Sequence, residues 1–301
     1  MFAFLRTRLQ QGTRTQPSLD DGAELPERYR GRPGFDPTRC RDGCASCRPG
    51  FPSGLLTVDG EGRTGLDVGA GLFAPEEAST CPHQAISFTN DYRMATRSRE
   101  ALLTPDGELR LAEALDHQMR RLFGRSLRLR SVAAGSCNGC EAELVALGNV
   151  VFDLARFGVQ FVASPRHADG MVVTGAVSRN MREALYRTYE AIPEPRLVIA
   201  VGACAINGGP FRGSPEVANG VPPDIPVDLL IPGCPPHPLT VLDGLLRLLG
   251  RLDGAPRGPR ARHASASPSR VTSGDEGNES PVAGGEVAAP PRPSQSDLFE
   301  L

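Results

Sequence analysis

The sequence predicts an α/β protein: a parallel sheet covered by helices on both faces, preceded by a small α+β domain and followed by a disordered tail. Apolar runs of strand length alternate with helical patterns from residue 126 to 250. Residues 1–104 are rich in glycine, proline and turn signals. Beyond residue 251 the chain is mostly Pro, Ser, Gly, Ala and Arg, which bury too little apolar surface to fold.

Short apolar runs at 55–58 and 85–88 predict strands in a loop-dominated N-terminal domain. Residues 105–125 are predicted to connect this domain to the next. Apolar residues at helical spacing, from Leu111 to Leu122, predict a helix there over 109–123.

The α/β domain is predicted from five strands and three helices. The predicted strands are 127–133, 160–163, 171–174, 197–201 and 227–231. The predicted helices are 141–156, 179–191 and 237–249. Such alternation favours parallel strands, because each crossover connection is a helix that covers one face of the sheet.

Composition excludes several classes of protein. The 301 residues are 40% hydrophobic, enough for two small cores, and contain no apolar run of the ~18 residues that would span a membrane. The N-terminus lacks the apolar segment of a secretory signal, so a cytoplasmic protein is expected. A net charge of −2 gives no indication of nucleic-acid binding, and no phosphate-binding loop or dinucleotide fingerprint is present.

All eight cysteines fall into two groups of four. The first group is Cys40, Cys44, Cys47 and Cys81, and the second is Cys137, Cys140, Cys204 and Cys234. In each group a proline follows the last cysteine. Since a [4Fe–4S] cluster takes four thiolates, two complete groups predict two [4Fe–4S] clusters and an electron-transfer function.

Each cysteine of the second group follows a predicted parallel strand, which is where open α/β sheets bind ligands. Loops from three strands are therefore expected to converge on one cluster. Neighbouring glycines, such as Gly139 and Gly202, would let the backbone approach it closely.

Residues 126–250 contain the motifs Gly135-Ser136-Cys137-Asn138-Gly139-Cys140-Glu141, Ser164-Pro165-Arg166-His167, Val201-Gly202-Ala203-Cys204 and Pro232-Gly233-Cys234-Pro235-Pro236. In these motifs the region resembles the small subunit of membrane-associated (group 4) [NiFe] hydrogenases, such as formate hydrogenlyase, and more distantly the B (20 kDa) subunit of complex I. Cys137 and Cys140 are separated by two residues, as in the hydrogenases, whereas complex I B subunits have adjacent cysteines at this position. The resemblance implies a flavodoxin-like sheet and a [4Fe–4S] cluster that exchanges electrons with a hydrogenase-like large subunit.

Three other side chains of the predicted α/β domain are candidates for further roles. The resemblance suggests that Glu143 relays protons at the subunit interface, whereas its place near a helix start would favour an acid whatever its function. Glu141 is interpreted as a first-turn acid and His167 as a structural residue.

Residues 1–104 contain Tyr29-Arg30-Gly31-Arg32-Pro33, the motif that begins at Cys40, and Cys81-Pro82-His83-Gln84-Ala85-Ile86. In these motifs they resemble the two-cluster ferredoxin subunit of the same complexes. In such a ferredoxin, three cysteines of one motif and the last cysteine of the other hold each cluster. Here the first motif has Phe51 in place of its fourth cysteine, and the second has Gly71, Ala74 and Glu77 in place of its first three. The losses leave one complete site and remove the other, so the chain resembles a fusion of a one-cluster ferredoxin-like domain to the hydrogenase-type domain.

The predicted function is therefore electron relay through two clusters, within a complex that also contains other ferredoxin-type and membrane subunits. Attachment to the cytoplasmic face of the membrane would come through those partners. One alternative is a B-type subunit of a complex I-like NADH/quinone oxidoreductase. Another is an interaction module stabilised by zinc, which an all-cysteine group also suits.

Overall fold

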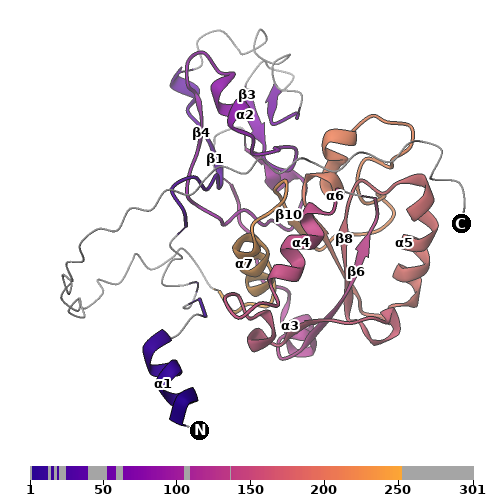
Figure 1. The fold of residues 1–301 in the computed structure, drawn as a ribbon. Helices are drawn as coiled ribbons and strands as arrows, with labels where there is room; N and C mark the ends of the chain where they lie inside the picture. Colours follow the sequence, from indigo (N-terminus) through magenta and orange to yellow (C-terminus); the bar gives the residue numbers. More distant parts are fainter. Residues whose placement is uncertain are drawn as a thin grey trace, which may run out of the picture. The chain divides into compact units, whose positions relative to one another are not determined.

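The computed structural model describes residues 2–12, 15–16, 19, 25–39, 53–58, 64–104, 109–135 and 137–252 (Figure 1). The predicted tail lies outside this part, except for Arg251 and Leu252. Within the described ranges, no helix is both long and apolar enough to cross a membrane.

A five-stranded parallel sheet forms the centre of the α/β region, in the order β10-β9-β8-β6-β7 (Figure 1). Its strands are β6 (Leu127–Ala133), β7 (Val159–Phe161), β8 (Gly170–Thr174), β9 (Leu197–Val201) and β10 (Leu229–Ile231). Every residue of β8 and β9 is buried, as expected for central strands covered on both faces. The predicted fold class of this region is confirmed.

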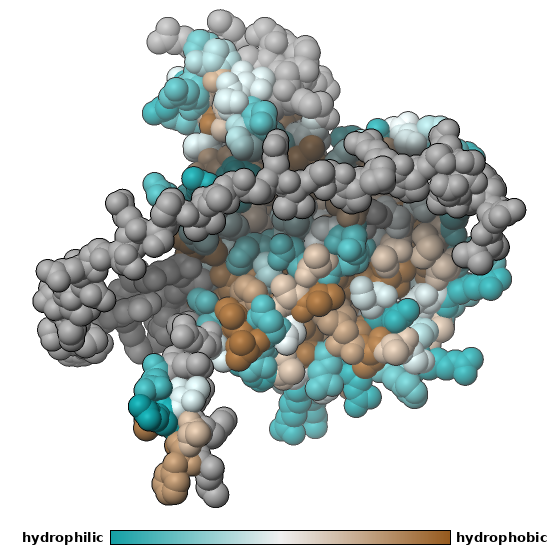
Figure 2. All heavy atoms as spheres, in the orientation of Figure 1, coloured by the Kyte–Doolittle hydropathy of each residue, from teal (hydrophilic) through white to brown (hydrophobic). Residues whose placement is uncertain are grey.

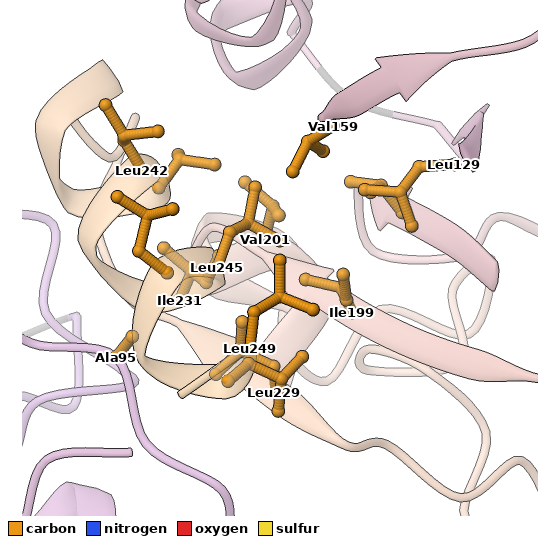
Figure 3. Close-up of a cluster of buried hydrophobic side chains, with 14 of the residues drawn as sticks. Ala95, Leu129, Val159, Ile199, Val201, Leu229, Ile231, Leu242, Leu245 and Leu249 are labelled. Carbon is orange, nitrogen blue, oxygen red and sulfur yellow. The ribbon is translucent and has the colours of Figure 1, made fainter. Parts of the chain in front are cut away.

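Helices cover both faces of the sheet. On one face, α4 (Gly139–Ala146) and α7 (Pro238–Leu248) pack against alternate strand residues in the larger core cluster. On the other face, α5 (Arg179–Ala191) packs in a second cluster around Leu185. Figure 3 shows the first face, where leucines of and beside α7 meet strand residues: Leu242, Leu245, Leu249, Ile199, Val201, Leu229 and Ile231. Burying such side chains stabilises the folded state by about 25 cal/mol for each Å² of apolar surface removed from water.

The register aligns the carboxyl ends of four strands. The last residues of β6, β8, β9 and β10 pair in one row: Ala133, Thr174, Val201 and Ile231. Three of the connections that leave this row carry the cysteines of the second group, in loops or in the first turn of the helix that follows. The sheet thus brings together side chains that lie far apart in the sequence.

Two predicted helices are shorter than expected. The connecting helix, α3, spans only His117–Phe123, because Asp116 caps its N-terminus by accepting from the Met119 N–H at 2.9 Å. The preceding residues instead run along the α/β region, where the Leu115 N–H donates to the Leu248 carbonyl. The predicted helix 141–156 ends with α4 at Ala146, and a separate 3-10 turn, Leu154–Phe157, follows.

We call residues 25–104, as far as they are described, the N-terminal lobe. It contains a two-stranded antiparallel sheet, β1 (Pro33–Phe35) with β4 (Ile86–Phe88). A three-stranded sheet follows the order β2-β3-β5, and its strands are β2 (Leu56–Val58), β3 (Thr64–Asp67) and β5 (Leu103–Thr104). A short helix, α2 (Pro75–Ser79), precedes Cys81. Another helix, α1 (Phe2–Gln11), precedes the lobe.

The N-terminal lobe packs directly against the α/β region. Thr96 forms an antiparallel bridge with Leu230 on the edge strand β10, through N–H···O bonds of 3.0 and 2.8 Å. A core cluster joins residues of both parts, among them Val68, Phe73, Ala205 and Leu230. The lobe therefore contacts the sheet beside the strands that lead to Cys204 and Cys234.

Candidate metal centre

Backbone hydrogen bonds join the loops at the carboxyl edge of the sheet. After β9, the Gly202 N–H donates to the carbonyl of Ile231, the last residue of β10, at 2.8 Å, and the Ala203 N–H donates to the Gly233 carbonyl just beyond it at 2.9 Å. These bonds tie the segment that carries Cys204 to the loop that carries Cys234. The loop after β6 reaches the same place, because a Cβ on Gly202 would lie 2.5 Å from the Sγ of Cys140.

The four cysteines of the second group form one electrostatic group. None of them is in a disulfide, and Cys137 is exposed whereas Cys140 and Cys204 are buried. Every pair of these four cysteines interacts electrostatically, because a negative charge on one sulfur would oppose a negative charge on another. The structure thus brings together the residues predicted as ligands of the second cluster.

Burial and this repulsion raise the pKa of the thiols. Burial, followed by the neighbouring Cys204, raises the pKa of Cys140 to about 12. Burial, followed by Cys234, raises the pKa of Cys204 to about 11, and burial is also the main cause of the raised pKa of Cys234. Without a bound cation these thiols stay protonated near neutral pH, and bound iron would supply the positive charge that favours the thiolates.

The donor set and its surroundings fit an iron–sulfur cluster. Gly202 has a φ of +88°, a conformation that glycine adopts without the strain of a side chain, and it leaves space beside the Cys140 thiol. The described residues contain no group of three or more His, Cys, Asp or Glu side chains arranged for a single metal ion. A [4Fe–4S] cluster differs from such a site because it binds each thiolate to a different iron.

The two acidic residues of α4 have different surroundings. Glu141 accepts a 2.6 Å hydrogen bond from the Thr174 hydroxyl at the end of β8, and its charge raises the pKa of Cys140 and Cys204. Glu143 is half-buried, and burial raises its pKa. Sequence reasoning selected Glu143 and treated Glu141 as a first-turn acid. It missed the effect of the Glu141 charge on the thiols, which the position of Glu141 next to Cys140 could have indicated.

The first group of cysteines is described only at Cys81. The other three, Cys40, Cys44 and Cys47, lie outside the described residues, as does Phe51. Cys81 is buried in a small core of the N-terminal lobe, and its Sγ accepts from the Ala85 N–H at 3.3 Å. The convergence of this group on one cluster stays a prediction.

A histidine without an assigned role lies near the second group. His237 caps α7, where its Nδ1 accepts from the Leu239 N–H at 3.2 Å, and burial lowers its pKa. The rings of Tyr29 and Phe152 meet its ring edge to face, with centroids 5.3 and 5.9 Å away. These contacts support a structural role. His167 lies in a 3-10 turn, Pro165–His167, at the start of the segment that leads to β8.

The chain is similar in sequence to several known proteins. Residues 137–248, which include all four cysteines of the second group, match the family described as NADH ubiquinone oxidoreductase, 20 Kd subunit. The probable membrane-bound hydrogenase subunit mbhJ of Pyrococcus furiosus is 41% identical over 150 residues, which cover 50% of this chain and 90% of that protein. Formate hydrogenlyase subunit 7 of Escherichia coli is 40% identical over 151 residues, covering 50% of this chain and 59% of its own length.

A B-type subunit of the NADH-quinone oxidoreductase of a Roseiflexus species is 50% identical over 115 residues, 38% of this chain and 43% of that protein. The fold and these relatives define a class, the small subunits of hydrogenase and NADH-quinone oxidoreductase complexes. The chain belongs to the family of the 20 kDa subunit of NADH:ubiquinone oxidoreductase. The resemblance drawn for residues 126–250 is confirmed, while the ferredoxin-like fusion at residues 1–104 stays a prediction.

Proposed function

We propose that this chain is an electron-transfer subunit of a membrane-associated, hydrogenase-type complex of the formate hydrogenlyase kind. Its α/β region, residues 126–250, would hold a [4Fe–4S] cluster through Cys137, Cys140, Cys204 and Cys234. The observation that carries the proposal is the gathering of these four free thiols at the carboxyl edge of a parallel sheet. Such a cluster supplies reversible one-electron transfer at a potential that its protein surroundings set.

We propose a second cluster in residues 1–104, held by Cys40, Cys44, Cys47 and Cys81. The complementary losses of the two ferredoxin motifs support it, because they leave one full set of ligands. The contact of the N-terminal lobe with β10 would place this domain on the electron path to the strand-end cluster.

The partner that completes the active site would be a hydrogenase-like large subunit. Support comes from the surface beside the second group, where Cys137 is exposed and the apolar side chains Val145 and Val150 are 78% and 67% exposed. Figure 2 shows apolar side chains gathered over the region of α4, surrounded by hydrophilic ones. A protein partner would bury this surface. Glu143, on α4, would then act as a proton relay at the interface.

Membrane association would come through other subunits, and the free thiols suit the reducing cytoplasmic side. The alternative is a B-type subunit of an NADH/quinone oxidoreductase, which the identity to the Roseiflexus protein favours. Hydrogen uptake by the complex purified from its host, measured beside quinone reduction, separates the two functions.

Metal and sulfide analysis after anaerobic reconstitution tests the clusters. We expect about eight irons per chain and absorbance near 400 nm, because each cubane holds four irons. Cys204→Ser and Cys81→Ser should each lose about four of them, from different sites. One zinc and about four irons would show that the N-terminal site is a zinc site, and zinc alone would reject the electron-transfer function.

A further inference from the structure

A carboxylate of the N-terminal lobe is buried beside the α/β region. Glu77, on α2, is 6% exposed. Its Oε1 accepts from the Leu72 N–H at 3.0 Å and its Oε2 from the Ala74 N–H at 3.1 Å. Among the residues the structure describes, no basic side chain forms an ion pair with it. The two backbone bonds fix the orientation of the carboxylate.

The turn that Glu77 holds packs against the elements that position Cys204 and Cys234. Phe73, in this turn, belongs to the core cluster that contains Ala205 and Leu230. Ala205 follows Cys204 on α6 (Ala203–Asn207), and Leu230 lies on the strand that leads to Cys234. The N-terminal lobe and α6 are in close contact just before this turn, since a Cβ on Gly69 would lie 2.9 Å from Cγ2 of Ile206.

The charge of Glu77 reaches the second group of cysteines. Three causes raise the pKa of Cys234: burial, then Cys137, then Glu77. Among the described residues, Glu77 is the group outside the α/β region whose charge acts on this thiol. By its position in the motif, Glu77 stands where a two-cluster ferredoxin has a ligand cysteine, so a negative charge takes the place of a lost ligand.

We infer that Glu77 is a positioning residue that lowers the reduction potential of the strand-end cluster, through a fixed negative charge contributed by the N-terminal lobe. The inference rests on the [4Fe–4S] site proposed above. Reduction adds one electron to the cluster, and a nearby negative charge in a buried environment opposes that addition. Removing the charge should therefore raise the potential.

The experiment compares Glu77→Gln with Glu76→Gln in the full-length chain. Glu76 is the neighbouring residue of α2 and is exposed, so its substitution makes the same charge change away from the site. Both variants carry Cys44→Ser, which removes the N-terminal cluster and leaves one signal. The readouts are iron content, thermal unfolding and the midpoint potential from a redox titration followed by EPR.

We expect Glu77→Gln to shift the midpoint to more positive potential and Glu76→Gln to leave it unchanged. Glu77→Asp keeps the charge but withdraws it by one methylene, so its midpoint should lie between those of the parent chain and Glu77→Gln. Should Glu77→Gln fail to assemble the cluster, a positive shift in Glu77→Asp supports the inference, and an unchanged or negative shift overturns it.

Equal midpoints for Glu77→Gln and Glu76→Gln would also overturn the inference, while leaving the proposed function standing. If the parent Cys44→Ser chain binds no iron, the proposed cluster itself is wrong and the inference fails with it. The two failures are thus distinguished by the iron content of the parent chain.

Discussion

Gly202→Ala should damage the strand-end site through a single added methyl group. Gly202 has φ +88° and ψ 157°, a backbone region that only glycine adopts readily, and enforcing it on alanine costs about 1–3 kcal/mol. The new Cβ would lie 2.5 Å from the Cys140 Sγ, and overpacking of this kind costs about another 1–3 kcal/mol. The free energy of unfolding should fall by about 2–6 kcal/mol, a large part of the stability of a typical domain.

The assay is urea unfolding of the metal-free protein, together with iron analysis after reconstitution. Gly202→Ala should lose about four of the expected eight irons, because Cys140 is displaced from its ligand position. Gly213→Ala is the matched control, since Gly213 has φ +82° but a Cβ there meets nothing within 4 Å. It should show the backbone cost alone and keep its iron. Full iron content in Gly202→Ala would refute the assignment of Cys140 to a close-packed cluster site.

Three further outcomes follow from buried charges, the thiols and the tail. The metal-free protein should lose stability as pH rises above about 8.5, because the raised pKa values of Cys140 and Cys204 favour the protonated thiols in the folded state. Urea unfolding from pH 8 to about 10.5 measures this loss. In Cys140→Ala the loss of stability should be smaller. Arg247→Met should lower the free energy of unfolding by about 3–5 kcal/mol. It leaves the Asp243 carboxylate, which is 1% exposed, without the Arg247 guanidinium that donates to it at 2.8 Å. The double variant Arg247→Met/Asp243→Leu should recover most of that stability in the same urea measurement. Truncation after Arg251 should preserve iron content and complex assembly, and loss of co-purification with the partner would identify the tail as a docking element.

The sequence alone determined the parallel sheet and the placement of the second cysteine group. β6, β9 and α5 span the predicted residues, because a buried strand or an amphipathic helix imposes a local period on its own sequence. Since parallel strands end at one edge, cysteines just after three of them had to approach one another. The bounds of α3 were predicted less well, because the Asp116 cap and the contact with Leu248 outweigh the apolar spacing before it.

The tertiary structure alone decided which residues surround the cysteines. No periodicity relates Glu77 to Cys234, yet the packing of the N-terminal lobe on β10 and α6 brings its charge to that thiol. The bond from Thr174, at the end of another strand, likewise fixes Glu141, whose charge acts on Cys140 and Cys204. Local patterns record which face of an element is buried, whereas the electrostatic neighbours of a thiol depend on contacts between distant segments that leave no regular spacing in the sequence.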